Sequence, residues 1–346
     1  MLPKSGSLRR GAAAAGGLAA ALLAAAVGGG VIASPAAPEG HGGWVGTWAT
    51  GDQPLDHAPL PAGFTAISFS NATLREIVHV SVGGSALRVR LDDTYGDGPL
   101  TFADAHVGLA GANTSPAIAA GTDRTLTFGG QPAVTVAQGA QAFSDPVRLH
   151  VPAQADLAVS LFLPGSNAMV TGHHNAKQGS FVAAAGDHAA DVVGTSFTTS
   201  IFDWYWLNGV DVFSASARGA VVAIGDSITN GAVSTFDGNN RWTDFLARRL
   251  LAAPASERRG VLDEGIDGAQ LLTFRTDCCP TQEAGLAVLD RSVIAQTGVT
   301  HVIVLLGTND LGFGVPASEA QVVGAQQQRP GLRRPGVRDH RRPAAA

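Results

Sequence analysis

The chain has 346 residues and a formal net charge of −5, because 28 Asp and Glu residues outnumber 23 Lys and Arg residues. Hydrophobic residues make up 45% of it, which excludes a globally disordered protein, and the length suffices for about two domains. A mildly acidic chain lacks the basic face that nucleic-acid binding requires. Its two cysteines exclude a disulfide framework and a cysteine-rich zinc domain.

The N-terminal segment, residues 1–37, has the pattern of an export signal. Lys4, Arg9 and Arg10 form a positive region, and residues 11–32 are almost all Ala, Gly, Leu and Val. Small residues around the end of this run offer cleavage sites. A transmembrane anchor is the alternative, but Ala and Gly favour membrane insertion only weakly. We therefore predict a cleaved signal peptide and a secreted protein without a stable membrane anchor.

Residues 40–200 have the pattern of a β-rich accessory domain. Residues 74–82 and 87–91 alternate between apolar and polar side chains, and Gly83-Gly84 lies between them. Glycine supplies the positive φ of a tight hairpin turn, so these two runs predict a β-hairpin. Gly129-Gly130 predicts a second such turn. Many short strands separated by Gly and Pro favour a β-sandwich or jelly roll.

The pattern changes at residues 201–218, which we interpret as a linker whose aromatic cluster, Trp204 to Trp206, packs between two domains. From residue 219 to residue 324, short apolar runs alternate with helical patterns, which is typical of a parallel sheet covered by helices. The expected strands are residues 220–224, 260–262 and 301–306, and the expected helices are residues 242–250 and 283–295. The first and last of these strands are expected to be buried on both faces.

The first strand of this second domain runs directly into Gly225-Asp226-Ser227. A Ser at the carboxyl end of a buried parallel strand lies where α/β folds place reactive groups. Gly225 allows a tight turn, and the Ser N–H can face outward as an oxyanion donor. A structural Ser in a strand-to-helix turn is the alternative. A phosphate-binding loop is disfavoured because no Gly-Lys-Ser/Thr is present.

Two further glycine-containing turns are expected at the same edge of the sheet. Gly268 follows the second strand, and Gly307-Thr308-Asn309-Asp310 follows the third. The Asn309 amide and a backbone N–H of the Gly268 turn can point at developing negative charge, so a three-donor oxyanion hole is predicted. We expect Asp226 and Asp310 to brace the turns rather than to act as an acid pair.

With these three blocks in order, the sequence resembles the SGNH hydrolases, also called GDSL esterases/lipases. Gly225-Asp226-Ser227 matches the family's first block, Gly268 the glycine of the second, and Gly307 to Asp310 the third. The β-rich region resembles the extra N-terminal domain of certain secreted members. The resemblance implies a flavodoxin-like three-layer α/β/α fold without metal or cofactor. It also implies hydrolysis of carboxylic esters, with Ser227 as nucleophile and Ser227, Gly268 and Asn309 as oxyanion donors.

The family's last block, Asp-x-x-His, has no counterpart after Asp310. His340 directly follows Asp339, and adjacent residues point in different directions on a strand or helix, so this pair does not match the block. The catalytic His and Asp are therefore unknown from sequence, and the hydrolase domain, residues 219–324, is predicted to be incomplete. Residues 325–346 form a basic tail rich in Arg and Pro, which we interpret as the product of a reading-frame shift. A solvated tail for an acidic partner is the alternative.

One further group carries metal-ligating side chains: His173, His174, Asp187, His188 and Asp191. Their spacing fits no standard metal site, so we predict surface polar residues of the β-rich domain and no metal.

The leading function is a secreted serine esterase acting on an acylated polysaccharide, a lipid or a small ester. A catalytically impaired relative that at most binds glycan is the alternative, since the Asp-x-x-His block is absent. A nucleotide-binding α/β protein is a weaker alternative.

Overall fold

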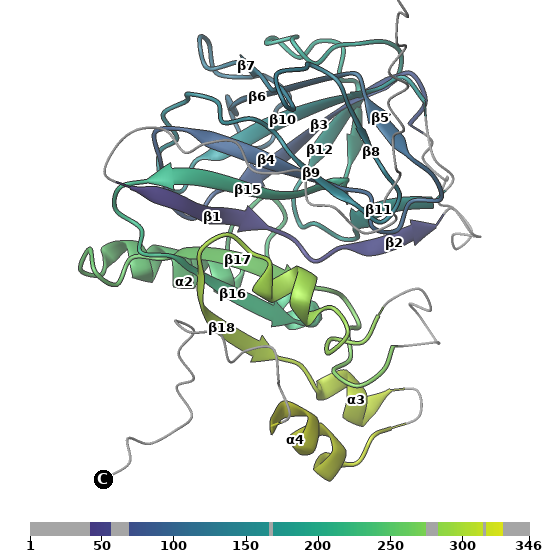
Figure 1. The fold of residues 1–346 in the computed structure, drawn as a ribbon, viewed down its shortest axis with the longest axis vertical. Helices are drawn as coiled ribbons and strands as arrows, with labels where there is room; N and C mark the ends of the chain where they lie inside the picture. The colour runs from purple at the N-terminus through teal and green to yellow at the C-terminus, as the bar shows by residue number, and fades with distance from the viewer. Residues whose placement is uncertain (1–41, 57–68, 166–168, 275–282, 314–315, 328–346) are drawn as a thin grey trace, which may run out of the picture. The chain divides into compact units, whose positions relative to one another are not determined.

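The computed structural model describes residues 42–56, 69–165, 169–274, 283–313 and 316–327 (Figure 1). All of them belong to one compact unit. The predicted export signal and nearly all of the basic tail lie outside the described residues. None of the described helices is long and apolar enough to cross a membrane.

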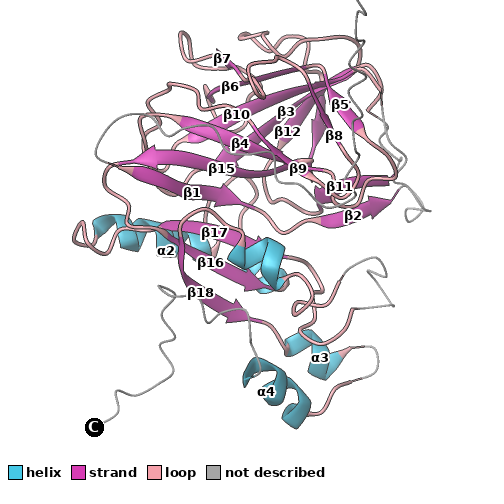
Figure 2. Ribbon diagram, in the orientation of Figure 1, coloured by secondary structure: helices cyan, strands magenta, loops and turns pink. Residues whose placement is uncertain are grey.

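Antiparallel strands make up the β-rich region, as Figure 2 shows in magenta. A four-stranded sheet has the order β1 (Gly43–Ala49), β15 (Leu207–Ser214), β4 (Leu87–Asp92) and β9 (Gln141–Phe143). A six-stranded sheet has the order β13 (Thr199–Ile201), β12 (Ser180–Ala183), β3 (Ala72–His79), β10 (Asp156–Leu163), β6 (Asp104–Leu109) and β7 (Arg124–Thr125). Smaller sheets join β14 (Trp204–Tyr205), β11 (Met169–His173) and β2 (Gln53–Asp56), and join β5 (Leu100–Phe102) and β8 (Val134–Val136).

One of the two predicted glycine turns is present and the other is not. Gly129 and Gly130 have φ of 61° and 80°, and Phe128 and Gln131 exchange backbone hydrogen bonds across them, so this tight turn is confirmed. The hairpin predicted around Gly83 is wrong, because β3 and β4 belong to different sheets. A Cβ at Gly83 would overlap the backbone of residues 151–153, so this glycine permits close backbone packing.

Strands and helices alternate after residue 219, as predicted. A parallel sheet has the order β17 (Gly260–Gly265), β16 (Ala220–Gly225) and β18 (Val299–Leu305). The helices are α1 (Ser227–Asn230), α2 (Trp242–Ala252), the π-helix η1 (Asp290–Ile294), α3 (Thr308–Gly312) and α4 (Glu319–Gln327). The second predicted helix, at residues 283–295, is thus reduced to the five residues of η1.

Burial within this parallel sheet is uneven. Every residue of β16 is buried, as expected for a central strand. The prediction that residues 301–306 are buried on both faces is wrong, because Ile303 and Leu305 are 37% and 41% exposed. β18 is an edge strand, and among the described residues no strand pairs with its far side.

The first predicted helix is confirmed as α2, although the apolar residues Trp242, Phe245, Leu246 and Leu250, which recur at helical spacing, are not its most buried ones. Thr243 and Ala247 are buried, whereas Phe245 is exposed and lies under the guanidinium of Arg248 at 4.4 Å. Small residues face inward here because the helix lies close to β17, where the Thr243 hydroxyl donates to Asp263 at 2.6 Å. Short side chains allow this close approach.

Residues 201–218, expected to form a linker, contain β14 and all of β15. β15 is buried along its whole length because it lies between β1 and β4. Trp204 packs edge-on against Trp48 at 5.0 Å and lies 5.8 Å from the guanidinium of Arg241, which precedes α2. The aromatic cluster is therefore buried where the β-rich region contacts the α/β region, in agreement with a packing role.

Candidate functional site

The three sequence blocks begin at the same level of the parallel sheet. Gly225 at the end of β16 is paired with Gly265 of β17 on one side and with Leu305 of β18 on the other. The chain leaves all three strands at this edge. Ser227 therefore starts α1 beside the turn that carries Gly268 and beside α3, which carries Asn309.

The first block forms a strand-to-helix turn that presents Ser227 at the sheet edge. The Asp226 carboxylate accepts a hydrogen bond from the Ile228 N–H at 2.9 Å and caps α1. Gly231, with φ of 102°, ends this single turn of helix. Ser227 is partly exposed, whereas Thr229 and Asn230 are buried, so the short helix is fixed while its first residue remains accessible.

The second and third blocks are bound to each other. The Asn309 amide donates to the Ala269 carbonyl at 2.9 Å, and the Gln270 amide donates to the Asn309 carbonyl at 2.8 Å. The Asp310 carboxylate accepts hydrogen bonds from the N–H groups of residues 271 and 272 at 2.7 and 2.9 Å. Gly268 has φ of 78°, a left-handed conformation that favours glycine.

The first and second blocks are also in contact. The Ile266 N–H donates to the Gly225 carbonyl at 3.1 Å, and the Asn230 amide donates to Asp267 at 2.9 Å. A Cβ at Gly265 would overlap the backbone nitrogen of Asn230, so α1 lies directly against the end of β17. The structure thus brings the segments of Ser227, Gly268 and Asn309 together at one edge.

Three donor groups at this edge each have a hydrogen that is not bound to an acceptor among the described residues. Among the described residues, the N–H groups of Ser227 and Gly268 donate to no acceptor. The Asn309 amide uses one hydrogen on Ala269, which leaves its second hydrogen. Uncommitted donors on neighbouring segments are suited to binding an oxygen that gains negative charge.

Carboxyl groups surround these donors. Burial raises the pKa of Asp226 above its ordinary value, and the nearby charges of Asp267 and Asp310 add to this effect. Asp226 and Asp310 each accept backbone hydrogen bonds, so their carboxyls hold the turns in place. Asp226 and Asp310 therefore stabilise the turns, as predicted. The catalytic roles of Ser227, Gly268 and Asn309 stay predictions.

The β-rich region supplies site residues that the sequence did not indicate. His173 is 1% exposed, and its ring nitrogens lie 2.8 Å from the Gly51 carbonyl and 2.8 Å from Asn230 Oδ1. Burial lowers the pKa of His173. The prediction of a surface residue is therefore wrong for His173. Its ring is buried because it forms a hydrogen bond with Asn230 of α1.

Two neighbours of His173 also reach the site. The Asn175 amide donates to Asp267 at 2.7 Å, and its carbonyl accepts from Asn230 at 3.4 Å. His174 is exposed and its Nδ1 lies 3.1 Å from Asp203. The run His173-His174-Asn175 was the one sequence feature that pointed to this segment. No local motif predicts that it contacts Asp203 or α1.

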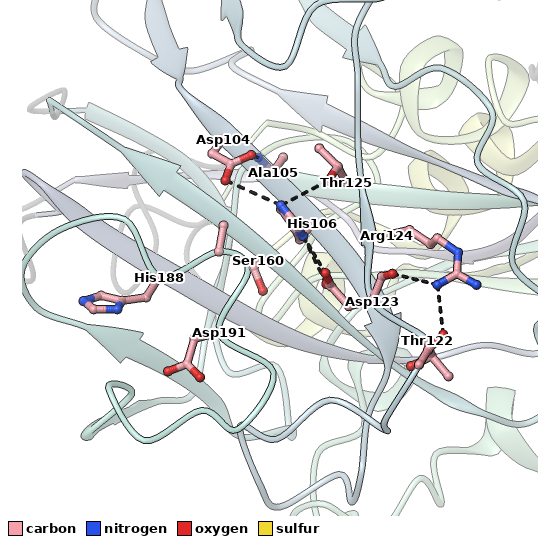
Figure 3. A network of polar contacts seen from close by, with 12 residues as sticks. Asp104, Ala105, His106, Thr122, Asp123, Arg124, Thr125, Ser160, His188 and Asp191 are labelled. Atoms are coloured by element: carbon pink, nitrogen blue, oxygen red, sulfur yellow. Dashed lines mark hydrogen bonds and ion pairs between the residues drawn. The ribbon is translucent and has the colours of Figure 1, made fainter.

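The other candidate metal ligands lie elsewhere, on the loop that follows β12. Figure 3 shows His188 and Asp191 apart from each other and from His106, whose Nδ1 contacts Asp123 at 2.9 Å. His188 Nε2 lies 2.9 Å from the Ala185 carbonyl. In the described ranges, no three His, Cys, Asp or Glu side chains are grouped so that they could hold a metal ion.

Residues 223–334 match the model of the GDSL-like Lipase/Acylhydrolase family. This match confirms the resemblance inferred from the three blocks, and by family such a domain is an ester hydrolase. No curated protein matches the chain.

Some solved structures of carbohydrate esterases are similar to the chain at low scores. A family two carbohydrate esterase from Clostridium thermocellum in complex with cellohexaose has 13% identity and a TM-score of 0.27, covering 83% of this chain and 67% of its own. A family two carbohydrate esterase from Cellvibrio japonicus has 13% identity and a TM-score of 0.25, with coverage of 83% and 73%. An acetyl xylan esterase from the rumen bacterium Butyrivibrio proteoclasticus has 13% identity and a TM-score of 0.25, with coverage of 79% and 63%. At TM-scores this low, the alignments establish neither the fold nor the activity of this chain.

Proposed function

We propose that the GDSL-like lipase/acylhydrolase domain of this chain hydrolyses carboxylic esters with Ser227 as its nucleophile. The observation that supports the proposal is that a partly exposed Ser227 lies on a segment in contact with those of Gly268 and Asn309, and these segments carry three uncommitted donors. These donors are its own N–H, the Gly268 N–H and the second amide hydrogen of Asn309. The family match and this geometry support the same reaction class, acyl transfer to a serine.

The reaction follows from these positions. Ser227 Oγ attacks the ester carbonyl carbon and passes its proton to a base, while the carbonyl π electrons move onto the oxygen. The three donors stabilise this oxyanion, and each such donor typically contributes about 10²–10³ in turnover. Collapse of the tetrahedral intermediate breaks the bond to the alcohol, which takes up the proton. Water then attacks the acyl-Ser227 ester by the same route and releases the acid.

The surroundings of the site support a substrate with an apolar face. Ile228, Leu311 and Phe313 are 51%, 48% and 45% exposed, and they lie next to Ser227 and within or after α3. Exposed apolar and aromatic side chains suit the face of a sugar ring or an acyl chain. We propose an acylated carbohydrate first, with a lipid or a small ester as the other substrate classes.

Two finer proposals accompany the activity. We propose that the protein is secreted, on the basis of the N-terminal signal pattern alone. We also propose that the α/β region has a flavodoxin-like three-layer arrangement and that the β-rich region is a jelly-roll-like sandwich. Strand alternation and the two larger antiparallel sheets support these assignments.

The direct test is turnover of p-nitrophenyl acetate by the full chain and by Ser227→Ala. We expect the unchanged chain to be faster by about 10³-fold or more, because the variant loses its nucleophile. Ser256→Ala is the matched control, since Ser256 is exposed and lies beyond α2. Equal rates for the unchanged chain and Ser227→Ala would contradict the proposal and favour a catalytically impaired glycan-binding protein.

A further inference from the structure

A histidine from the β-rich region lies beside the segments that carry Ser227 and Gly268. His174 directly follows β11, and the next residue, Asn175, has φ of 61°, which turns the chain sharply. Asn175 contacts both Asn230 on α1 and Asp267, the residue before Gly268. These two contacts fix the backbone next to His174 against the first and second blocks at the same time.

The His174 ring is oriented as in a general base, with a carboxylate at Nδ1. Its Nδ1 lies 3.1 Å from Asp203 Oδ1, which leaves Nε2 for another partner, and 59% of the side chain is exposed. Asp203 is itself held in place, since it accepts from the Asn175 N–H at 2.7 Å and from the Tyr205 hydroxyl at 3.2 Å. A carboxylate on Nδ1 fixes the tautomer in which Nε2 accepts a proton.

The other histidine–carboxylate pairs do not offer this arrangement. His106 of β6 is 6% exposed and contacts Asp123, the residue before β7, as Figure 3 shows. His79 pairs with Asp156, and its Nε2 is buried with no hydrogen-bond partner among the described residues. Among the described pairs, only His174–Asp203 has an exposed ring and a chain neighbour in contact with α1.

We propose that His174 is the general base of the esterase reaction in this chain and that Asp203 is its positioning residue. This inference rests on the proposed function. The Ser227 Oγ–H bond breaks, its proton moves to His174 Nε2, and the oxygen electron pair forms the bond to the acyl carbon. The same proton then passes from Nε2 to the oxygen of the departing alcohol.

The free structure has no hydrogen bond between His174 and Ser227, both of which are described residues. Catalytic hydrogen bonds of this kind are often long in free enzymes and close when substrate binds. Both residues are accessible, and the Asn175 contacts hold the segment of His174 beside α1 and Asp267. The β-rich region then contributes a reacting group as well as packing.

The charges around His174 set the expected pH dependence. The hydrogen bond to Asp203 raises the pKa of His174 above its ordinary value, and Asp267 adds to this effect, while burial and Lys177 oppose it. A base must be neutral to accept a proton, so activity is lost as the pH falls through this raised pKa. We expect Asp203→Asn to move the acidic limb of kcat/KM to lower pH.

The test uses the full chain and measures two properties of each variant. The first is kcat/KM for p-nitrophenyl acetate as a function of pH. The second is the rate at which a fluorophosphonate labels Ser227, followed by intact mass. We expect His174→Ala to lower both by about 10²–10⁴-fold without changing the unfolding temperature. Free imidazole should restore part of the labelling rate, which a purely structural role would not allow.

His150→Ala is the matched control, because His150 is an exposed histidine of the β-rich region away from these contacts. It should behave like the unchanged chain. Labelling of His174→Ala at the unchanged rate would overturn the base assignment and leave the serine esterase intact. A chain that labels no faster than Ser227→Ala would overturn the proposed function, and with it the base.

Discussion

The two flanks of the site are built differently. The inner flank, α1 with residues 265–267, is held against the β-rich region by buried polar contacts from His173 and Asn175. The outer flank, β18 with α3, has Ile303, Leu305 and Leu311 exposed. Its strand pairs with β16, and its helix is joined to the Gly268 turn through the side chains of Asn309 and Asp310.

This difference shows that the β-rich region packs against the inner flank of the candidate site. One hydrophobic core contains residues of both regions, including Val45 of β1 and Leu262 of β17. The Gly46 N–H also donates to the Thr297 carbonyl at 3.0 Å. Changes on the inner flank should therefore affect stability and activity together, whereas changes on the outer flank should affect activity more than stability.

The largest effect is expected on the inner flank, from Gly265→Ala. The added Cβ would overlap the Asn230 backbone and push α1 away from β17. We expect a loss of about 3 kcal/mol in the free energy of unfolding and a loss of esterase activity beyond about 10²-fold. Urea unfolding and ester turnover measure the two effects. Gly312→Ala is the control, because a Cβ there meets nothing within 4 Å.

Asp310→Ala tests the outer flank. It removes the acceptor of two backbone hydrogen bonds and so frees the Gly268 turn from α3. We expect kcat/KM to fall by about 10²-fold and the free energy of unfolding to fall by about 1–2 kcal/mol. The same two assays apply. A stability loss as large as that of Gly265→Ala would erase the distinction between the flanks.

The smallest expected effect is on how the free energy of unfolding varies with pH, and it comes from a carboxyl group of the inner flank. Burial raises the pKa of Asp263 on β17 to about 6, while the charge of Arg241 and the Thr243 hydroxyl lower it. The folded protein then binds a proton more tightly than the unfolded chain, so Asp263 makes stability fall as the pH rises from about 4 to about 6. We expect Asp263→Asn to remove about 1–2 kcal/mol of this decline.

Unfolding measured in urea at pH 4.5 and pH 7 checks this prediction. Asp187→Asn is a control, because Asp187 is exposed and lies on the loop that follows β12. An identical decline in the unchanged chain and Asp263→Asn would show that other carboxyls carry the pH dependence.

The sequence predicted the α/β region and the three blocks because their signals are local. A buried apolar run followed by Gly225-Asp226-Ser227 contains both the strand and its turn, and the same holds for Gly307 to Asp310. The periodicity at residues 242–250 likewise predicted α2, although it could not show that Thr243 and Ala247 face inward.

The errors arose where pairing is not local. Gly83-Gly84 has the composition of a hairpin turn, but each flanking strand finds its partners elsewhere in the chain. The polarity of His173 predicts a surface position, yet Gly51 and Asn230, far away in sequence, contact both of its ring nitrogens. Contacts of this kind leave no periodic trace in one sequence.

The pairing of β1 with β15 has a consequence for synthesis of the protein. Within the described part of the chain, the strand at residues 43–49 pairs only with residues 207–214. During translation, β1 cannot pair with β15 until more than 150 further residues have been synthesised, at about 5–20 residues per second. The nascent chain therefore carries an unpaired apolar strand for many seconds, and folding of the β-rich region is delayed until its last strand emerges.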